Sequence, residues 1–245
     1  KAGIGIFVIV LIITAVRVKS MDSHRISGRI LAENIAGPGM MRLVEQSMQA
    51  QAQKTSVTEI AVKEWKHPQA ALTFDDGPDI RYTPLLLDGL KERNVRASFF
   101  LLGEKVEQYP ELVERMQKEG HLVGNHTYHH VQLNKLNETK AREEILKTNN
   151  LIYETTGVYP LYLRPPFGAW KKNLELCVEM LPVFWTIDTL DWKVQNTEKI
   201  VHTVQEQIED GAIILMHDEY DTSVEAALQV VDELKSQGYE LVTVD

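Results

Sequence analysis

From Gln69 to the end of the chain, short apolar runs alternate with longer stretches of helical periodicity. This alternation constrains the fold most strongly, because parallel strands need long connections and helices supply them. The predicted strands are Ala70–Phe74, Ala97–Leu102, His121–Val123, Leu161–Leu163, Val183–Thr186, Ile213–Met216 and Glu240–Val242. The pattern predicts an α/β fold with about seven parallel strands, either doubly wound or closed as a barrel.

Start and stop signals predict five helices between these strands. Thr83-Pro84 is typical of a helix start, and Gly120 and Gly238 are typical of helix ends. The predicted helices start near Thr83, run from Pro110 to near Gly120 and from about Asn137 to Thr156, and cover Thr197–Glu209 and Ser223–Gln237.

Polar residues follow directly on several predicted strands, namely Asp75, Asp76, Arg164, Asp188 and His217. In (β/α) barrels the C-terminal ends of the strands carry the catalytic groups. The placement of these residues therefore favours a barrel with a functional site at that edge.

The first 66 residues differ from the rest. Residues 2–16 carry no charge and would span about 22 Å as a helix, short of the roughly 30 Å hydrocarbon core. We expect residues 1–18 to be an apolar helix that serves as a signal anchor, since no small-residue cleavage site follows; a cleaved signal peptide is the alternative. Residues 19–66, interrupted by Gly37-Pro38-Gly39, are a predicted stalk or linker, and residues 67–245 the folded domain.

Charge and cysteine content exclude two classes of protein. The net charge is -9, and nucleic-acid binding needs clustered Lys and Arg, so no nucleic-acid partner is expected. The chain has one cysteine, which excludes an internal disulfide framework.

A metal site is predicted from two motifs. In His126-Thr127-Tyr128-His129-His130 the outer histidines are four apart, so on a helical turn both rings would share one face. Alone, such a pair is usually explained by surface histidines, and Asp76-Gly77 by a turn. Together with Asp76 the pair offers two imidazoles and a carboxylate, which suits a catalytic divalent ion, Zn²⁺ first and Co²⁺ as an alternative.

Three further motifs follow other strands: Arg164-Pro165-Pro166-Phe167-Gly168, Asp188-Thr189-Leu190-Asp191-Trp192 and Leu215-Met216-His217-Asp218. A rigidly held Arg can keep a carboxylate ionised, and a His at a strand end can act as general acid or base. Each motif alone also fits an ordinary structural role: a surface Arg in a tight loop, a core Trp beside a capping Asp, or a His with one hydrogen bond. The occurrence of all these motifs together at strand ends does not fit such ordinary roles.

The order Thr-Phe-Asp-Asp-Gly-Pro, His-Thr-Tyr-His-His, Arg-Pro-Pro-Phe-Gly, Asp-Thr-Leu-Asp-Trp and Leu-Met-His-Asp resembles the five motifs of the polysaccharide deacetylase family, carbohydrate esterase family 4 or the NodB homology domain. The resemblance covers about residues 69–245. It implies a distorted (β/α) barrel and metal-dependent hydrolysis of N-acetyl groups on an amino-sugar polymer.

The resemblance also implies residue roles. Asp76, His126 and His130 would be the metal ligands, Asp75 the catalytic base and His217 the general acid. Arg164 would orient Asp75, and Asp191 would tune His217. The substrate-binding residues would be Trp192 and Leu215, around the acetyl methyl, and Phe167, through its backbone N–H. The family usually has Tyr in place of Phe167 and often Trp in place of Tyr128; His129 is interpreted as a bystander.

Family and predicted anchor together suggest a wall polymer. Peptidoglycan N-acetylglucosamine is the expected substrate, with chitooligosaccharide or exopolysaccharide as the alternative. The expected location is the cell membrane, single-pass with the catalytic domain outside the cytoplasm, or else secretion. The competing hypothesis of another class is a non-catalytic carbohydrate-binding domain, which predicts loss of at least one of the five central residues. All five are present.

Overall fold

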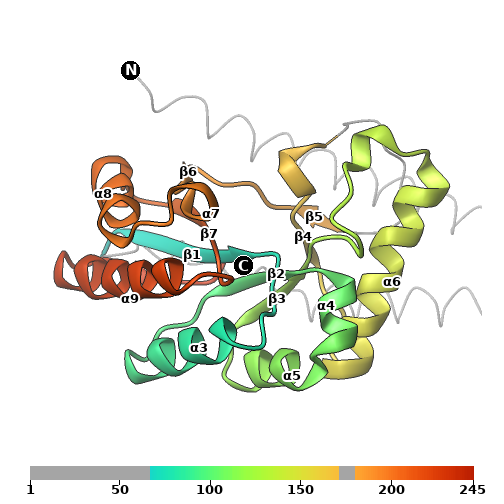
Figure 1. Ribbon diagram of the computed structural model, residues 1–245, viewed down its shortest axis with the longest axis horizontal. Coiled ribbons are helices and arrows are strands. Elements are labelled where there is room, and N and C mark those ends of the chain that lie inside the picture. The colour runs from blue at the N-terminus through green and yellow to red at the C-terminus, as the bar shows by residue number, and fades with distance from the viewer. Residues whose placement is uncertain (1–66, 171–179) are drawn as a thin grey trace, which may run out of the picture. The chain divides into compact units, whose positions relative to one another are not determined.

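In the computed structural model, which describes residues 67–170 and 180–245, one parallel sheet organises the chain (Figure 1). Its order is β5-β4-β3-β2-β1-β7-β6, with β8 beside β1, and every pair is parallel. The strands are β1 (Gln69–Asp75), β2 (Ser98–Leu101), β3 (Leu122–Asn125), β4 (Tyr162–Leu163), β5 (Leu181–Pro182), β6 (Ile187–Asp188), β7 (Ala212–His217) and β8 (Glu240–Leu241). The two ends of this order, β5 and β6, follow each other directly in the chain, so the sheet curls round until its ends are joined. The fold is therefore the predicted distorted (β/α) barrel.

Helices lie between most successive strands: α3 (Tyr82–Glu92), α4 (Gly103–Gln108), α5 (Pro110–Lys118), α6 (Glu138–Thr156), α7 (Asp191–Val194), α8 (Thr197–Gln207) and α9 (Asp221–Ser236), with the short 3-10 turns η1 (Leu133–Lys135) and η2 (Pro166–Gly168). All five predicted helices are confirmed, each beginning within two residues of its predicted start. Asn137 and Asn196 cap α6 and α8, because each side chain accepts a hydrogen bond from the backbone N–H three residues on. The short helices α4 and α7 were not predicted.

Thr83 lies at the predicted start of α3 but does not cap the helix. Arg81 holds the N-cap position of α3 and makes no side-chain cap. The Thr83 hydroxyl instead accepts a hydrogen bond from the backbone N–H of Asp79, at 2.7 Å, and donates one to the buried Asp218. Its side chain therefore ties the turn after β1 to the end of β7.

The predicted strand Val183–Thr186 is wrong. Two short strands flank this segment: β5 pairs with β4, and β6 pairs with β7. The Val183 N–H still donates to the Leu163 carbonyl, whereas the Thr186 N–H donates to the Ile213 carbonyl. The segment thus crosses from one end of the sheet to the other, and two short strands, β5 and β6, take the place of the one predicted here.

The core lies against β1 and its neighbours. Phe74 of β1 stacks on Phe99 of β2, with ring centroids 5.2 Å apart, and both are buried. On one side α3 packs closely on α9, since a Cβ added at Gly89 would lie 2.4 Å from Leu228. This packing fixes β1 and β7, whose ends carry much of the site, in the centre of the sheet.

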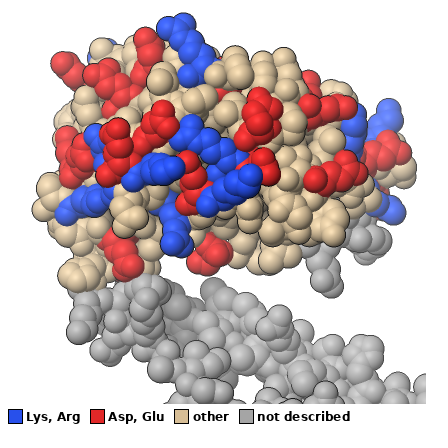
Figure 2. All heavy atoms as spheres, turned by 90° about the horizontal axis from the view of Figure 1, so that it is seen from below, with Lys and Arg blue, Asp and Glu red and all other residues tan. Residues whose placement is uncertain are grey.

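Several ion pairs lie on the surface, and Lys and Arg intermingle with Asp and Glu over the face shown in Figure 2. Arg115, for example, pairs with both Asp88 and Glu119. Among the described helices, none combines the length and apolarity that crossing a bilayer requires. The predicted anchor (1–18) and stalk (19–66) lie outside the described residues.

Candidate active site

Strand register brings the predicted residues to one edge of the sheet. In the β1–β7 pair, Asp75 lies directly beside His217. In the β3–β4 pair, Asn125 lies beside Leu163, so that His126 and Arg164 follow side by side. Since all strands are parallel, these four residues share the C-terminal edge, where sequence patterning placed the site.

Asp76, His126 and His130 form a group with the geometry of a metal site. The Nε2 atoms of His126 and His130 each lie 3.4 Å from Asp76 Oδ1. One ligand atom from each residue lies within 4.8 Å of the others. Asp76 Oδ1 is buried and, within the described part of the chain, has no hydrogen-bond partner. A buried oxygen without a partner is costly unless something else satisfies it.

These distances fit a small divalent ion. Two atoms that are each about 2.0–2.1 Å from a tetrahedral Zn²⁺ lie about 3.3 Å apart. The observed separations of 3.4 Å therefore need little adjustment. The side chains provide three of four tetrahedral positions, as in catalytic rather than structural zinc sites.

His126 has the protonation state that a ligand needs. Its Nδ1 lies 2.6 Å from the Arg164 carbonyl, so Nδ1 carries the proton and Nε2 faces Asp76 with its lone pair. Burial lowers the pKa of this imidazole to about 3, despite the nearby Asp76 carboxylate. His126 is therefore neutral around pH 7.

The helical turn predicted for His126–His130 is wrong. These residues form an irregular loop after β3, with φ of 66° at Thr127 and 53° at His130. The loop still brings the two imidazoles together, with ring centroids 5.0 Å apart. His129 points elsewhere, as expected, and its ring pairs with Glu144.

Asp75 differs from its neighbour Asp76. It is buried, and its Oδ1 accepts a 2.7 Å hydrogen bond from Nη1 of the fully buried Arg164. Burial raises the pKa of Asp75 above its ordinary value, although the charges of Arg164 and His217 oppose the rise. A carboxylate with a raised pKa is a stronger base, which suits proton abstraction from water.

His217 is held by Asp191 at the other side of the site. The imidazole Nδ1 lies 2.8 Å from Asp191 Oδ1, and the backbone N–H of His217 donates to Oδ2 at 2.8 Å. Burial lowers the pKa of His217, but the hydrogen bond and charge of Asp191 outweigh burial and raise it to about 9. Its Nε2 lies 3.8 Å from Asp76 Oδ2, so a protonated nitrogen faces the triad.

A cavity of about 440 Å³ opens over these groups. The three predicted substrate-binding residues line it: Phe167 and Trp192 are exposed, and Leu215 is buried. The Phe167 ring packs against His130, with centroids 4.5 Å apart.

Comparisons with known proteins agree with this geometry. A family model described as polysaccharide deacetylase matches residues 63–184. The solved structure of peptidoglycan deacetylase PdaC from Bacillus subtilis superimposes with a TM-score of 0.71 at 42% sequence identity, over 73% of this chain and 89% of that one. This chain belongs to the polysaccharide deacetylase family.

Two curated relatives within this polysaccharide deacetylase family differ in their named substrates. Peptidoglycan-N-acetylglucosamine deacetylase PgdA of Listeria monocytogenes is 44% identical over 175 residues, which are 71% of this chain and 38% of that protein. Peptidoglycan-N-acetylmuramic acid deacetylase PdaC of Bacillus subtilis is 43% identical over 174 residues, 71% of this chain and 37% of that protein. The chain thus matches less than two fifths of the length of either relative.

The cavity of this family member is also lined by Asp188 of the fourth motif and by three residues that were not predicted, Trp185, Glu219 and Tyr220. Asp188 was a sequence signal, because it stands at a strand end. Trp185 lies in the mispredicted strand, and Glu219 and Tyr220 directly follow the fifth motif. Their proximity to His217 was the only signal available for them.

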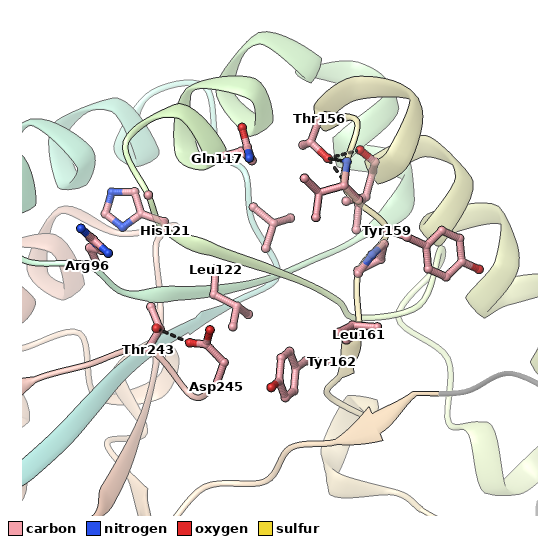
Figure 3. A pocket seen from close by; sticks show the side chains of 15 residues that line it. Arg96, Gln117, His121, Leu122, Thr156, Tyr159, Leu161, Tyr162, Thr243 and Asp245 are labelled. Atoms are coloured by element: carbon pink, nitrogen blue, oxygen red, sulfur yellow. Dashed lines mark hydrogen bonds between the residues drawn. The ribbon is translucent and has the colours of Figure 1, made fainter. Parts of the chain in front are cut away.

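A second cavity, of about 280 Å³, lies at the other ends of the strands (Figure 3). His121 and Leu122 precede or begin β3, and Tyr162 begins β4. Its one histidine, His121, accepts a hydrogen bond through Nδ1 from the Ala97 N–H. Among the described residues, the cluster of metal ligands is at the first cavity, which is therefore the candidate active site.

Proposed function

We propose that this chain removes N-acetyl groups from an amino-sugar polymer, peptidoglycan N-acetylglucosamine, and releases acetate. The observation that carries the proposal is the placement of a buried carboxylate and a cationic imidazole on paired strands, beside a triad that fits a divalent ion. Membership of the polysaccharide deacetylase family and the names of the relatives support the reaction class.

Hydrolysis of an acetamide needs an activated water, and Asp75 supplies the base. A divalent ion in the triad, Zn²⁺ by its ligand set, would polarise the acetyl carbonyl and lower the pKa of water. Asp75 Oδ1 is bound to Arg164, while Oδ2 lies 3.6 Å from His126 Nε2 and so points toward the triad. Oδ2 is therefore the atom that takes the water proton.

The departing amine needs a proton, and His217 supplies it. The raised pKa keeps the imidazole protonated around pH 7. Asp191 fixes the ring through Nδ1, which leaves the Nε2 proton directed into the cavity. A proton delivered by Nε2 to the sugar nitrogen completes cleavage of the C–N bond.

The rest of the cavity orients the acetyl group. Trp192 and Leu215 offer an apolar wall for the methyl, and the Phe167 backbone N–H offers a donor for the carbonyl oxygen. One such donor is typically worth about 10²–10³ in rate.

The predicted apolar segment at residues 1–18 supports a membrane location with the domain outside the cytoplasm, where peptidoglycan lies. Protease added to intact cells should digest the domain. Protection of the domain until the cells are lysed would contradict this location.

The polymer is tested by acetate release from three substrates: purified peptidoglycan, N-acetylglucosamine oligomers and an N-acetylated exopolysaccharide. Mass spectrometry of digested peptidoglycan separates glucosamine from muramic acid products. We expect peptidoglycan to be the best substrate, with new free amines on glucosamine. Deacetylated muramic acid would overturn the choice of sugar, and acetate from none of the three would overturn the reaction class.

A further inference from the structure

The loop that carries both histidine ligands has an unfavourable backbone. Thr127 and His130 adopt positive φ angles of 66° and 53°, which L residues with a Cβ avoid. Such a conformation persists only when neighbouring groups hold it in place. The groups that hold this loop therefore determine where the two imidazoles lie.

Glu144 of α6 makes three contacts to the middle of the loop. Its Oε2 accepts hydrogen bonds from the backbone N–H groups of Tyr128, at 3.1 Å, and His129, at 2.9 Å. Its Oε1 lies 2.7 Å from His129 Nδ1. The Glu144 side chain is 16% exposed, so water competes weakly for these bonds.

The loop is fixed on its other side by backbone groups of α4. The N–H groups of Gly103 and Glu104 donate to the carbonyls of Thr127 and Tyr128, at 3.0 and 3.3 Å. Glu144 therefore completes a clamp: α4 satisfies the carbonyls of Thr127 and Tyr128, while Glu144 satisfies the N–H groups of Tyr128 and His129. A charged acceptor that binds two successive N–H groups is stronger than a neutral one.

We propose that Glu144 is a positioning residue for the metal triad, holding the loop so that His126 and His130 converge on Asp76. It acts through the backbone on either side of the 128–129 peptide, and it does not touch the triad itself. The inference rests on the metal triad of the proposed function but is independent of the sugar and of the reaction.

The same geometry gives His129 a lesser role. Its ring is 58% exposed and contributes one of the three contacts to Glu144. Removing the ring leaves both backbone hydrogen bonds in place. Of these two residues, Glu144 rather than His129 is therefore the one whose loss should weaken metal binding.

The test is the affinity of the full chain for Zn²⁺, measured by competition with a chromophoric chelator. Glu144→Ala should weaken binding by about 10- to 100-fold, the range typical for residues that orient metal ligands. The Zn²⁺ affinity of Glu144→Gln should lie between those of the wild type and Glu144→Ala, since the amide oxygen can still accept hydrogen bonds from the backbone. Glu143→Ala, on the same helix but exposed, and His129→Ala should bind Zn²⁺ as the wild type does.

Urea unfolding of each metal-free variant accompanies the measurement. If Glu144→Ala does not fold, Glu144→Gln decides the question. Wild-type affinity in a folded Glu144 variant, or an equal loss in Glu143→Ala, would overturn the proposal. A wild-type chain that binds Zn²⁺ but releases no acetate would contradict the proposed function and leave this inference intact.

Discussion

At the scale of single residues, two adjacent carboxylates have different surroundings. Asp75 is buried and bonded to Arg164, whereas Asp76 presents an oxygen without a hydrogen bond to two imidazoles. The chain leaves β1 at Asp76 with φ of 68°, and each of the two side chains still places one oxygen near His126 Nε2, at 3.6 Å for Asp75 and 3.4 Å for Asp76. One residue can therefore act as base while the other binds a cation.

Asp75→Asn should lower kcat by about 10²–10⁴, the range for loss of a general base. Zinc affinity should stay near that of the wild type, since Asp75 is not in the triad. Acetate release and chelator competition measure the two quantities. Asp232→Asn, the same exchange on the surface, should change neither, and near wild-type kcat in Asp75→Asn would refute the role of base.

Asp191→Asn should lower the pKa of His217 from its value of about 9, because Asp191 is the main group that raises it. NMR titration of the His217 ring in the metal-free chain measures this directly. The activity of the variant should fall with it, as less of the imidazole is protonated at neutral pH. An unchanged pKa would mean that Asp191 only shapes the loop.

At the scale of elements, local signals predicted the helices better than the short strands. Asn137 and Asn196 are recognisable caps, and α6 and α8 begin directly after them. The segment 183–186 has the composition of a strand, but whether it pairs depends on distant strands. The loop at His126–His130 is hydrogen-bonded to Glu144 of α6 and to the backbone of α4, and local spacing cannot reveal these contacts.

Asn137→Ala should reduce the free energy of unfolding by about 1 kcal/mol, because the N-cap hydrogen bond to Lys140 N–H is lost. Urea unfolding measures the change. Asn150→Ala, an exposed position within α6, is the control and should cost less. Equal losses in both variants would show that the cap contributes nothing particular.

His121, the residue directly before β3, should make the free energy of unfolding depend on pH. Burial lowers the pKa of His121 from 6.5 to about 4, so protonation is disfavoured in the folded state. The stability that the neutral ring provides is complete above pH 6.5 and is lost as pH falls toward 4, by up to about 3 kcal/mol. His121→Asn should flatten this part of the profile; parallel profiles for the variant and the wild type would contradict it.

At the scale of the whole molecule, the parallel sheet explains why residues from five distant motifs meet. Strands that all run the same way bring their C-terminal ends to one edge, so the order of motifs in the sequence becomes a cluster in space. The fold class and the clustering followed from this rule. The rule could not predict that Trp185 and Glu219 line the cavity or that Glu144 contacts the histidine loop, because these positions depend on loops and packing.

We propose that Asp75 and His217 act beside a divalent ion held by Asp76, His126 and His130. The measurement that tests it most directly is acetate release from peptidoglycan by the purified chain after chelation, and then after addition of Zn²⁺ or Co²⁺. We expect acetate release to be lost on chelation and to recover at about one ion per chain. Full release from the chelated, metal-free chain would contradict it.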